Sequence, residues 1–312
     1  MGTMANGKWV TDADIATAKD GAWQRTPSVL CGIVKPTGSK DDYVAKTGRY
    51  HLYAAWNCPW AHRALLGRVF KGLEGVIDVS FCAPRRTDQG WVFTTDYPDD
   101  LHASSALHEL YAQAVSDYSG RVTVPILWDK HTSTIVSNES ADILRMMGSA
   151  WNDAGANDLD LYPAALRHEI DGWNDRIHTG LNNGVYRAGF AETQAAYDSA
   201  VREVFKTLDL IESRLSETEW IAGSQITEAD LRLFPTLARF DVAYHGAFKC
   251  SIRRLIDYPA LWRYARRLYA MPGVAQTVRF GVYKAGYWST SIKRNPLGIV
   301  PIGPELDWTL NN

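Results

Sequence analysis

The chain has few cysteines and lacks the features of a membrane or secreted protein. Its 312 residues include only four cysteines, Cys31, Cys58, Cys82 and Cys250, too few and too scattered for a disulfide framework or a zinc site. No run of eighteen apolar residues occurs, so we expect no membrane-spanning helix. The polar first twenty residues also lack the apolar centre of a signal peptide. These absences favour a protein of the reducing cytoplasm.

Neither sign of charge is in excess. The 33 Lys and Arg residues nearly balance the 35 Asp and Glu residues, which leaves no electrostatic basis for binding nucleic acid or an anionic membrane. Aromatic residues are abundant instead, with 12 Trp and 15 Tyr. Most such residues belong to cores and interfaces, but aromatic side chains can also line a pocket for a flat, apolar substrate. The length allows two domains with substantial cores.

Cys58 stands out among the cysteines because of the segment around it. Residues 49–55, Arg-Tyr-His-Leu-Tyr-Ala-Ala, favour a buried strand, and Pro59 suits the first turn of a helix. Cys58 then lies at or beside a helix N-terminus, where unpaired N–H groups and the helix dipole favour the reactive thiolate. A lone cysteine is more often an inert core residue. The strand-Cys-Pro-helix context favours a nucleophile.

The residues after Cys58 indicate its reaction partner. In a Cys-x-x-Cys motif that began at Cys58, the second cysteine would stand at residue 61, which is alanine here. Cys58 therefore has no neighbouring cysteine with which to form a disulfide. His62 and Arg63 lie one turn further and can add positive potential if they face the sulfur. We therefore expect an external thiol as the partner.

Hydrophobic patterning divides the chain into four parts. We expect an irregular arm over 1–48, a mixed α/β unit over 49–152, a helical unit over 153–280 and an extended tail over 281–312. The α/β unit is predicted to contain these elements in order: strand 49–55, a helix from residue 59, strand 77–82, an insertion with a helical stretch over 104–114, strand 121–129, strand 134–136, and a helix opening at 137–140.

The later unit shows only helical periodicity. One apolar helix face spans 166–181 and another spans 197–215. Further helices are predicted at 231–244, 259–270 and 274–278. Thr227-Glu-Ala-Asp230 has the pattern of a capping box, and we assign it to folding because a helix cap does no chemistry.

Three short motifs in order point to a known family. Cys-Pro-Trp lies at 58–60, Thr-Val-Pro at 123–125 and Asn-Glu-Ser at 138–140. With these blocks the chain resembles the glutathione transferases, and most closely their cysteine-bearing xi class, the glutathionyl-hydroquinone reductases. The resemblance covers nearly the whole chain. It implies an α/β thioredoxin-like N-terminal domain, an all-α glutathione-transferase C-terminal domain and assembly as a homodimer.

The resemblance also implies glutathione as co-substrate, with no metal. Pro125 resembles the family's cis-proline, which leaves the N–H and C=O of Val124 able to pair with a peptide; a trans proline at a strand edge is the alternative. Glu139 suits the ammonium of the γ-glutamyl group, and Ser140 suits its carboxylate. Plain capping of the helix is the alternative for both residues.

Two more residues are candidates for binding glutathione. Trp91 is a candidate wall over the peptide, with its indole N–H as a donor. Arg121 is a candidate partner for the glycine carboxylate, against the alternative that an arginine before a strand is a solvated charge.

The helical unit is expected to bind the aromatic part of the substrate. By resemblance, Tyr186 and Tyr287 lie near the quinol hydroxyls, because a phenol can both donate and accept a hydrogen bond. Tyr283 and Trp288 are further candidates for this pocket. The alternative for any one tyrosine is a packed aromatic ring with a satisfied hydroxyl.

The function implied is a two-step thiol exchange. The Cys58 thiolate attacks the sulfur of a glutathionyl-hydroquinone, a Cys58–glutathione disulfide forms, and a second glutathione releases oxidised glutathione. Two alternatives remain open. One is an omega-like thioltransferase, a deglutathionylase that uses the same cysteine on disulfides or glutathionylated proteins. The other is a non-catalytic, transferase-like assembly module.

Overall fold

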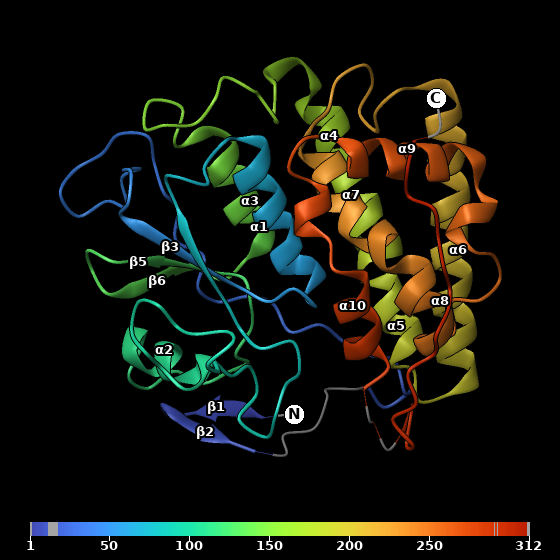
Figure 1. Ribbon diagram of the computed structural model, residues 1–312, viewed down its shortest axis with the longest axis horizontal. Helices are drawn as coiled ribbons and strands as arrows, with labels where there is room; N and C mark the ends of the chain where they lie inside the picture. The colour runs from blue at the N-terminus through green and yellow to red at the C-terminus, as the bar shows by residue number, and fades with distance from the viewer. Residues whose placement is uncertain (1, 12–17, 290, 292, 311–312) are drawn as a thin grey trace. The chain divides into compact units, whose positions relative to one another are not determined.

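The structure is a computed structural model that describes residues 2–11, 18–289, 291 and 293–310. The chain forms two units (Figure 1): Met1–Ile15 with Thr26–Asp160, and Ala16–Arg25 with Leu161–Asn312. The division after Asp160 falls later than the boundary expected at 152, and residues 18–25 of the expected arm group with the helical unit. Residues 1, 12–17, 290, 292 and 311–312 of the expected arm and tail lie outside the described residues.

A four-stranded sheet in the order β4-β3-β5-β6 forms the centre of the first unit. Strands β3 (Tyr50–Ala54) and β4 (Asp78–Phe81) are parallel, whereas β5 (Ile126–Asp129) and β6 (Thr134–Ser137) continue the sheet with antiparallel pairings. Every residue of β3 is buried, as expected for a central strand with both faces covered. This mixed sheet confirms the predicted thioredoxin-like class of the N-terminal domain.

Three helices cover the sheet. Helix α1 (Pro59–Phe70) packs against α3 (Ser140–Ser149), and α2 (Leu107–Ala114) contacts β6. Figure 1 shows α2 on the opposite side of the sheet from α1 and α3. The third strand begins at Ile126 and not at 121 as predicted, because Pro125 has no N–H to give to a β ladder.

Two segments predicted to be irregular contain regular structure. The expected arm includes β1 (Thr3–Ala5) and β2 (Lys8–Val10), an antiparallel hairpin with positive φ at Asn6 and Gly7, a turn typical of Asn-Gly. The tail predicted as extended from 281 begins instead as α10 (Phe280–Tyr287). Its apolar residues recur at helical spacing, a pattern that the surrounding Gly and Pro residues obscure in the sequence.

The regular elements formed by the described residues of the second unit are all helical, which confirms the predicted all-α domain. Helix α4 packs on α7, and α6 packs on α9. Besides α10 and two π-helical segments, the elements are η1 (Ala164–Leu166), α4 (Arg167–Arg176), α5 (Gly184–Gly189), α6 (Gln194–Glu217), α7 (Glu228–Arg239), α8 (His245–Ala247), η4 (Leu255–Asp257), α9 (Pro259–Ala270) and η5 (Ala275–Thr277). The capping box is present, since Asp230 accepts the N–H of Thr227 at 2.8 Å.

Two helices predicted as continuous are interrupted by π-helical turns. The helix expected over 166–181 changes to a π turn, η2 (Ile177–Asn182), and the helix expected over 231–244 changes to another, η3 (Phe240–Tyr244). A π turn contains an extra residue, so later side chains point in directions that an α-helical period does not predict. Asn182 of η2 is buried and donates to Thr236 Oγ1 of α7 at 2.7 Å, which connects the two interrupted helices.

A buried ion pair joins the start of β3 to the end of β5. Arg49 donates from Nε and Nη2 to the two carboxylate oxygens of Asp129, at 2.8 and 2.7 Å. Burial opposes ionisation of Asp129, but hydrogen bonds from Arg49, Thr132 and the N–H of His131 outweigh it. The pKa of Asp129 therefore lies below its ordinary value of 3.8.

We expect Asp129→Asn to reduce the acid sensitivity of the first unit. The folded pKa lies below the unfolded value of about 3.9, so the carboxylate stabilises the fold above that pH and loses this contribution as the pH falls through the folded pKa. The variant should have a lower free energy of unfolding near neutrality and a flatter dependence on pH below about 5. Urea unfolding over this range measures both quantities.

Asp78→Asn is the matched control for Asp129→Asn. Asp78 pairs with Lys130 at 3.1 Å, but its side chain is 64% exposed. Exposed pairs contribute little to stability, so this variant should retain the wild-type pH dependence. An Asp129→Asn protein with the wild-type pH dependence would contradict the assignment.

Candidate active site

Cys58 is the N-cap residue of α1. Its backbone is extended, with φ −84° and ψ 118°, and its carbonyl accepts the N–H of His62 at 3.1 Å. Pro59 occupies the first helical position, as the sequence predicts. The cysteine is 8% exposed, and its Sγ lies 3.5 Å from the carbonyl oxygen of Val124, to which a thiol at this position donates. The sulfur is thus positioned at the positive end of the helix.

The peptide bond between Val124 and Pro125 is cis, as the motif predicts. Val124 is buried, and its carbonyl oxygen lies 3.5 Å from the Cys58 sulfur. Because β5 begins only at Ile126, the backbone groups of Val124 are outside the β ladder. The cysteine and backbone groups outside the sheet therefore lie side by side, which suits a thiol-containing peptide.

Glu139 and Ser140 begin α3. The Glu139 carboxylate caps the helix, since it accepts the N–H of Ala141 at 3.0 Å, and it also accepts the hydroxyl of Ser28 at 3.0 Å. Ser140 is 3% exposed, with its hydroxyl 3.4 Å from Glu139 Oε1. The capping alternative is therefore real for Glu139. It is compatible with binding, because the N–H groups of a helix N-terminus also attract a carboxylate.

Arg63 connects the first turns of α1 and α3. It is 2% exposed, with its guanidinium 4.5 Å from the centre of the Trp60 ring, and its Nη1 lies 3.5 Å from the Ser140 hydroxyl. The buried guanidinium of Arg63 therefore lies beside the N-terminus of α3, and its contribution at the Cys58 sulfur stays a prediction. This arrangement favours a bound carboxylate at Ser140.

Trp91 and Arg121 belong to the same unit as Cys58. Trp91 is 3% exposed and its ring lies 4.2 Å from the guanidinium of Arg86, while its carbonyl accepts the N–H of Leu107 at the start of α2. Arg121 is half-buried, and its carbonyl accepts the Tyr118 hydroxyl at 2.9 Å. Their roles towards glutathione stay predictions.

The second unit brings together the two tyrosines that the sequence singles out and adds a third. The hydroxyls of Tyr186 on α5 and Tyr287 on α10 are 2.7 Å apart, and the hydroxyl of Tyr244 at the end of η3 lies 3.1 Å from that of Tyr287. Burial raises the pKa of both Tyr244 and Tyr287 well above the ordinary value. We call these three residues the phenol cluster. Tyr244 and Tyr287 therefore carry protonated hydroxyls at neutral pH.

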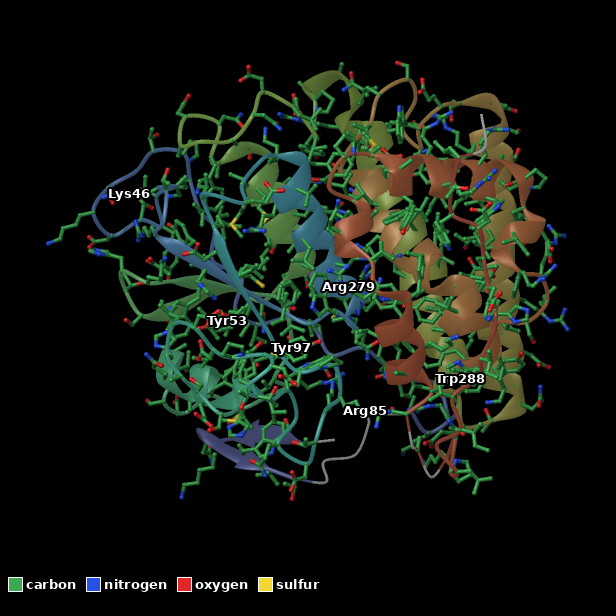
Figure 2. All side chains as sticks on the ribbon, in the orientation of Figure 1. Lys46, Tyr53, Arg85, Tyr97, Arg279 and Trp288 are labelled. Atoms are coloured by element: carbon green, nitrogen blue, oxygen red, sulfur yellow. The ribbon has the colours of Figure 1, made fainter. Side chains whose placement is uncertain are left out.

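Sequence reasoning missed Tyr244. It is one of fifteen tyrosines, and the π turn that carries it alters the α-helical period by which its direction could be judged. Tyr283, a weaker candidate, is fully buried and donates to the carbonyl of Thr277 at 3.2 Å. Trp288 lies at the end of α10 (Figure 2). Its ring packs closely against Gly246, since a Cβ added to Gly246 would lie 2.5 Å from the Trp288 ring.

Aromatic rings surround the phenol cluster. Tyr186 stacks on Phe190 with an interplanar angle of 6° and meets Phe248 edge-on at 5.3 Å. Trp23, from the short N-terminal segment that groups with this unit, lies 5.9 Å from Tyr186. Such walls suit a flat aromatic ligand.

The described part of the chain shows no group of three or more His, Cys, Asp or Glu side chains arranged to hold a metal ion. Within the same residues, no helix combines the length and the apolar character needed to span a membrane.

Comparison with known proteins identifies the family. The models described as "Glutathione S-transferase, N-terminal domain" and "Glutathione S-transferase, C-terminal domain" match residues 57–150 and 194–267. The chain is 44% identical over 307 residues to the glutathionyl-hydroquinone reductase PcpF of Sphingobium chlorophenolicum, covering 97% of this chain and 96% of that protein.

Solved structures agree with this assignment. The xi class glutathione transferase from Natrialba magadii superimposes with a TM-score of 0.92 at 39% identity, covering 100% of this chain and 96% of that chain. The glutathione-bound structure of YqjG, a glutathione transferase homolog from Escherichia coli K-12, gives a TM-score of 0.86 at 44% identity, covering 93% and 96%. The chain therefore belongs to the glutathione transferases, and within them to the xi class, the family of the glutathionyl-hydroquinone reductases.

Proposed function

We propose that this protein reduces glutathionyl-hydroquinones to hydroquinones, with glutathione as the reductant and Cys58 as the nucleophile. The observation that carries the proposal is the Cys58 sulfur at the N-terminus of α1, 3.5 Å from Val124 and beside a cis-proline. The relative PcpF, named a glutathionyl-hydroquinone reductase, supports the substrate class.

In the first half-reaction, the Cys58 thiolate attacks the sulfur of the glutathionyl group. A sulfur–sulfur bond forms as the carbon–sulfur bond breaks, and its electron pair passes to the ring carbon. That carbon takes a proton from the phenol cluster and leaves as part of the hydroquinone. The sulfur is oxidised to a disulfide while the ring is reduced.

In the second half-reaction, the thiolate of another glutathione attacks the glutathionyl sulfur held by Cys58. Oxidised glutathione leaves, and Cys58 returns to a thiolate. The sum is one glutathionyl-hydroquinone and one glutathione converted to one hydroquinone and one oxidised glutathione. No proton has to reach carbon in this half-reaction.

Glutathione is proposed to bind along the first unit. Val124 offers backbone groups to the peptide, Ser140 with Arg63 offers donors to the γ-glutamyl carboxylate, and Glu139 accepts from the ammonium. Trp91 is proposed as the wall over the peptide and Arg121 as the partner of the glycine carboxylate.

Ser140→Ala should raise the KM for glutathione about 10-fold, because it removes one hydroxyl donor to a charged carboxylate. The maximal rate at saturating glutathione should change little. Ser149→Ala, at the other end of α3, is the matched control, since that exposed hydroxyl donates only to the carbonyl of Arg145 among the contacts recorded. Equal KM values in the two variants would count against the carboxylate site.

The function is tested by mixing the protein with a glutathionyl-hydroquinone and glutathione, and measuring free hydroquinone and oxidised glutathione together. Equal amounts of both products are expected. If the aromatic substrate is inert but a small mixed disulfide of glutathione is reduced, the protein is an omega-like thioltransferase. If neither is turned over although glutathione binds, the assembly module is favoured.

We also propose that the protein works as a homodimer in the cytoplasm. The family resemblance supports the dimer, and the four cysteines, all free thiols in the structure, support a reducing compartment. Sedimentation of the full chain at several concentrations measures the oligomeric state.

A further inference from the structure

Arg239 is a fully buried arginine next to the phenol cluster. It is the last residue of α7 and directly precedes the π turn that ends in Tyr244. Its side chain has 0% exposure. The guanidinium carbon lies 3.7 Å from the centre of the Tyr283 ring, and Nη1 donates to the carbonyl of Pro235 at 2.9 Å. A cation placed so far from water needs an electrostatic reason.

The electron-rich face of the Tyr283 ring and the Pro235 carbonyl supply part of that reason. Burial disfavours the charged form of Arg239, but interactions with Tyr283, Tyr287 and Tyr244 outweigh it, and the pKa of the guanidinium lies above its ordinary value. The effect is mutual. Arg239 opposes the rise that burial causes in the pKa of Tyr244 and of Tyr287.

Helix geometry places the arginine at this point. Tyr283 and Tyr287 are one turn apart on α10. Tyr283 contributes the ring that lies against the guanidinium, and Tyr287 contributes a hydroxyl to the phenol cluster, so both come from the same stretch of that helix. Helix α10 packs against both α7 and η3. The arginine is therefore held on one side by Tyr283 and is adjacent in sequence to the π turn that positions Tyr244.

We propose that Arg239 is a positioning residue for proton donation: its buried charge stabilises the phenolate that the phenol cluster becomes when it protonates the leaving ring. The inference rests on the proposed function and names a residue that acts on one half-reaction of it.

The chemistry gives Arg239 a role in only one step. When the ring carbon takes a proton, a negative charge is left on the phenol cluster, where the hydrogen bonds of 2.7 and 3.1 Å spread it over three oxygens. A fixed cation in a site of low polarity stabilises that charge strongly, and a proton from water then restores the phenol. The attack of glutathione on the Cys58 disulfide creates no phenolate, so Arg239 should not affect it.

The test compares the two half-reactions in Arg239→Gln. Glutamine keeps a donor for the Pro235 carbonyl but removes the charge. In a single turnover with excess protein, hydroquinone release should be about 100-fold slower than in the wild type, the size expected when one stabilising donor of a developing anion is lost. Protein preloaded with glutathione on Cys58 should release oxidised glutathione within about twofold of the wild-type rate.

Two further variants separate charge from structure. Arg267→Gln is the matched control: Arg267 also donates to a backbone carbonyl, of Glu219, and lies 5.4 Å from the Trp220 ring, but it is on α9 and has no recorded contact with the phenol cluster. It should leave both half-reactions unchanged. Arg239→Lys restores a charge without the planar guanidinium and should recover most of the lost hydroquinone release.

Three outcomes would overturn the inference. One is an Arg239→Gln protein with wild-type hydroquinone release, and another is an equal loss in both half-reactions, which marks a purely structural role. If circular dichroism shows that Arg239→Gln does not fold, the test depends on Arg239→Lys. The third contrary outcome is then an Arg239→Lys protein that slows the two half-reactions equally. A wild-type protein that releases no hydroquinone, yet accepts glutathione on Cys58, would refute the proposed function instead.

Discussion

Cys58→Ser is expected to lower the rate of hydroquinone release by at least about 10⁴-fold, the scale on which removal of a covalent nucleophile acts. Serine retains the N-cap position of α1 and adds a side chain that is favourable there, so the fold should be unaffected. Its hydroxyl can still donate to a glutathione thiolate. It cannot form a disulfide, and the two-step exchange has no other route.

The experiment needs a readout of the intermediate as well as of the product. Wild-type protein mixed with a glutathionyl-hydroquinone, and no free glutathione, should gain the mass of one glutathionyl group on Cys58, and the Ser variant should gain none. Cys31→Ser is the matched control, because Cys31 is an exposed thiol of the same unit. It should retain full activity and the adduct. Substantial turnover by Cys58→Ser would exclude the covalent route.

Tyr287→Phe is expected to slow hydroquinone release by about 100-fold, within the range that general acid catalysis contributes. Tyr287 is the centre of the phenol cluster, since its hydroxyl bonds to those of both Tyr186 and Tyr244. Phenylalanine keeps the ring and its edge contacts with Tyr244 and Phe248 at 5.1 and 5.3 Å. The loss is therefore that of a proton donor and not of packing.

The three hydroxyls should behave as one acid. Adding Tyr186→Phe to Tyr287→Phe is expected to cost far less than the product of the two single effects, because residues of one hydrogen-bond network are not additive. Tyr197→Phe is the control, as that exposed hydroxyl donates to the carbonyl of Lys249. Fully multiplicative effects of the two cluster variants, measured in single turnovers, would refute a shared proton.

The parts of the molecule that the sequence predicts best are those set by local residue patterns. The strand before Cys58, the helix that starts at Pro59 and the α3 start at Ser140 all appear where their motifs place them. In each case a proline, a cap or an unbroken apolar run determines the element within a few residues. The position of the thiol could therefore be predicted from local pattern alone, whereas the cis bond before Pro125 is predicted only by the family resemblance.

The parts that could not be predicted depend on contacts between distant segments. Tyr244 becomes part of the site only because a π turn directs it towards Tyr287, and no single-residue pattern marks such a turn. Arg239 could not be predicted either. Arginine is usually exposed, but here its side chain is buried against Tyr283 of α10. Helix α10 lies in a segment that the sequence predicts as extended, since the chain from 281 to 312 is rich in Gly and Pro.

The two π turns have a consequence for how this second unit can vary among related proteins. An extra residue in a helix rotates everything after it by about 100°, so deleting one residue from η3 would replace Tyr244 at the cluster by a neighbour on the helix. A relative could thus keep every tyrosine in its sequence and still lose the hydroxyl network. For this unit, helix length between fixed points is as informative about proton donation as the identity of the residues.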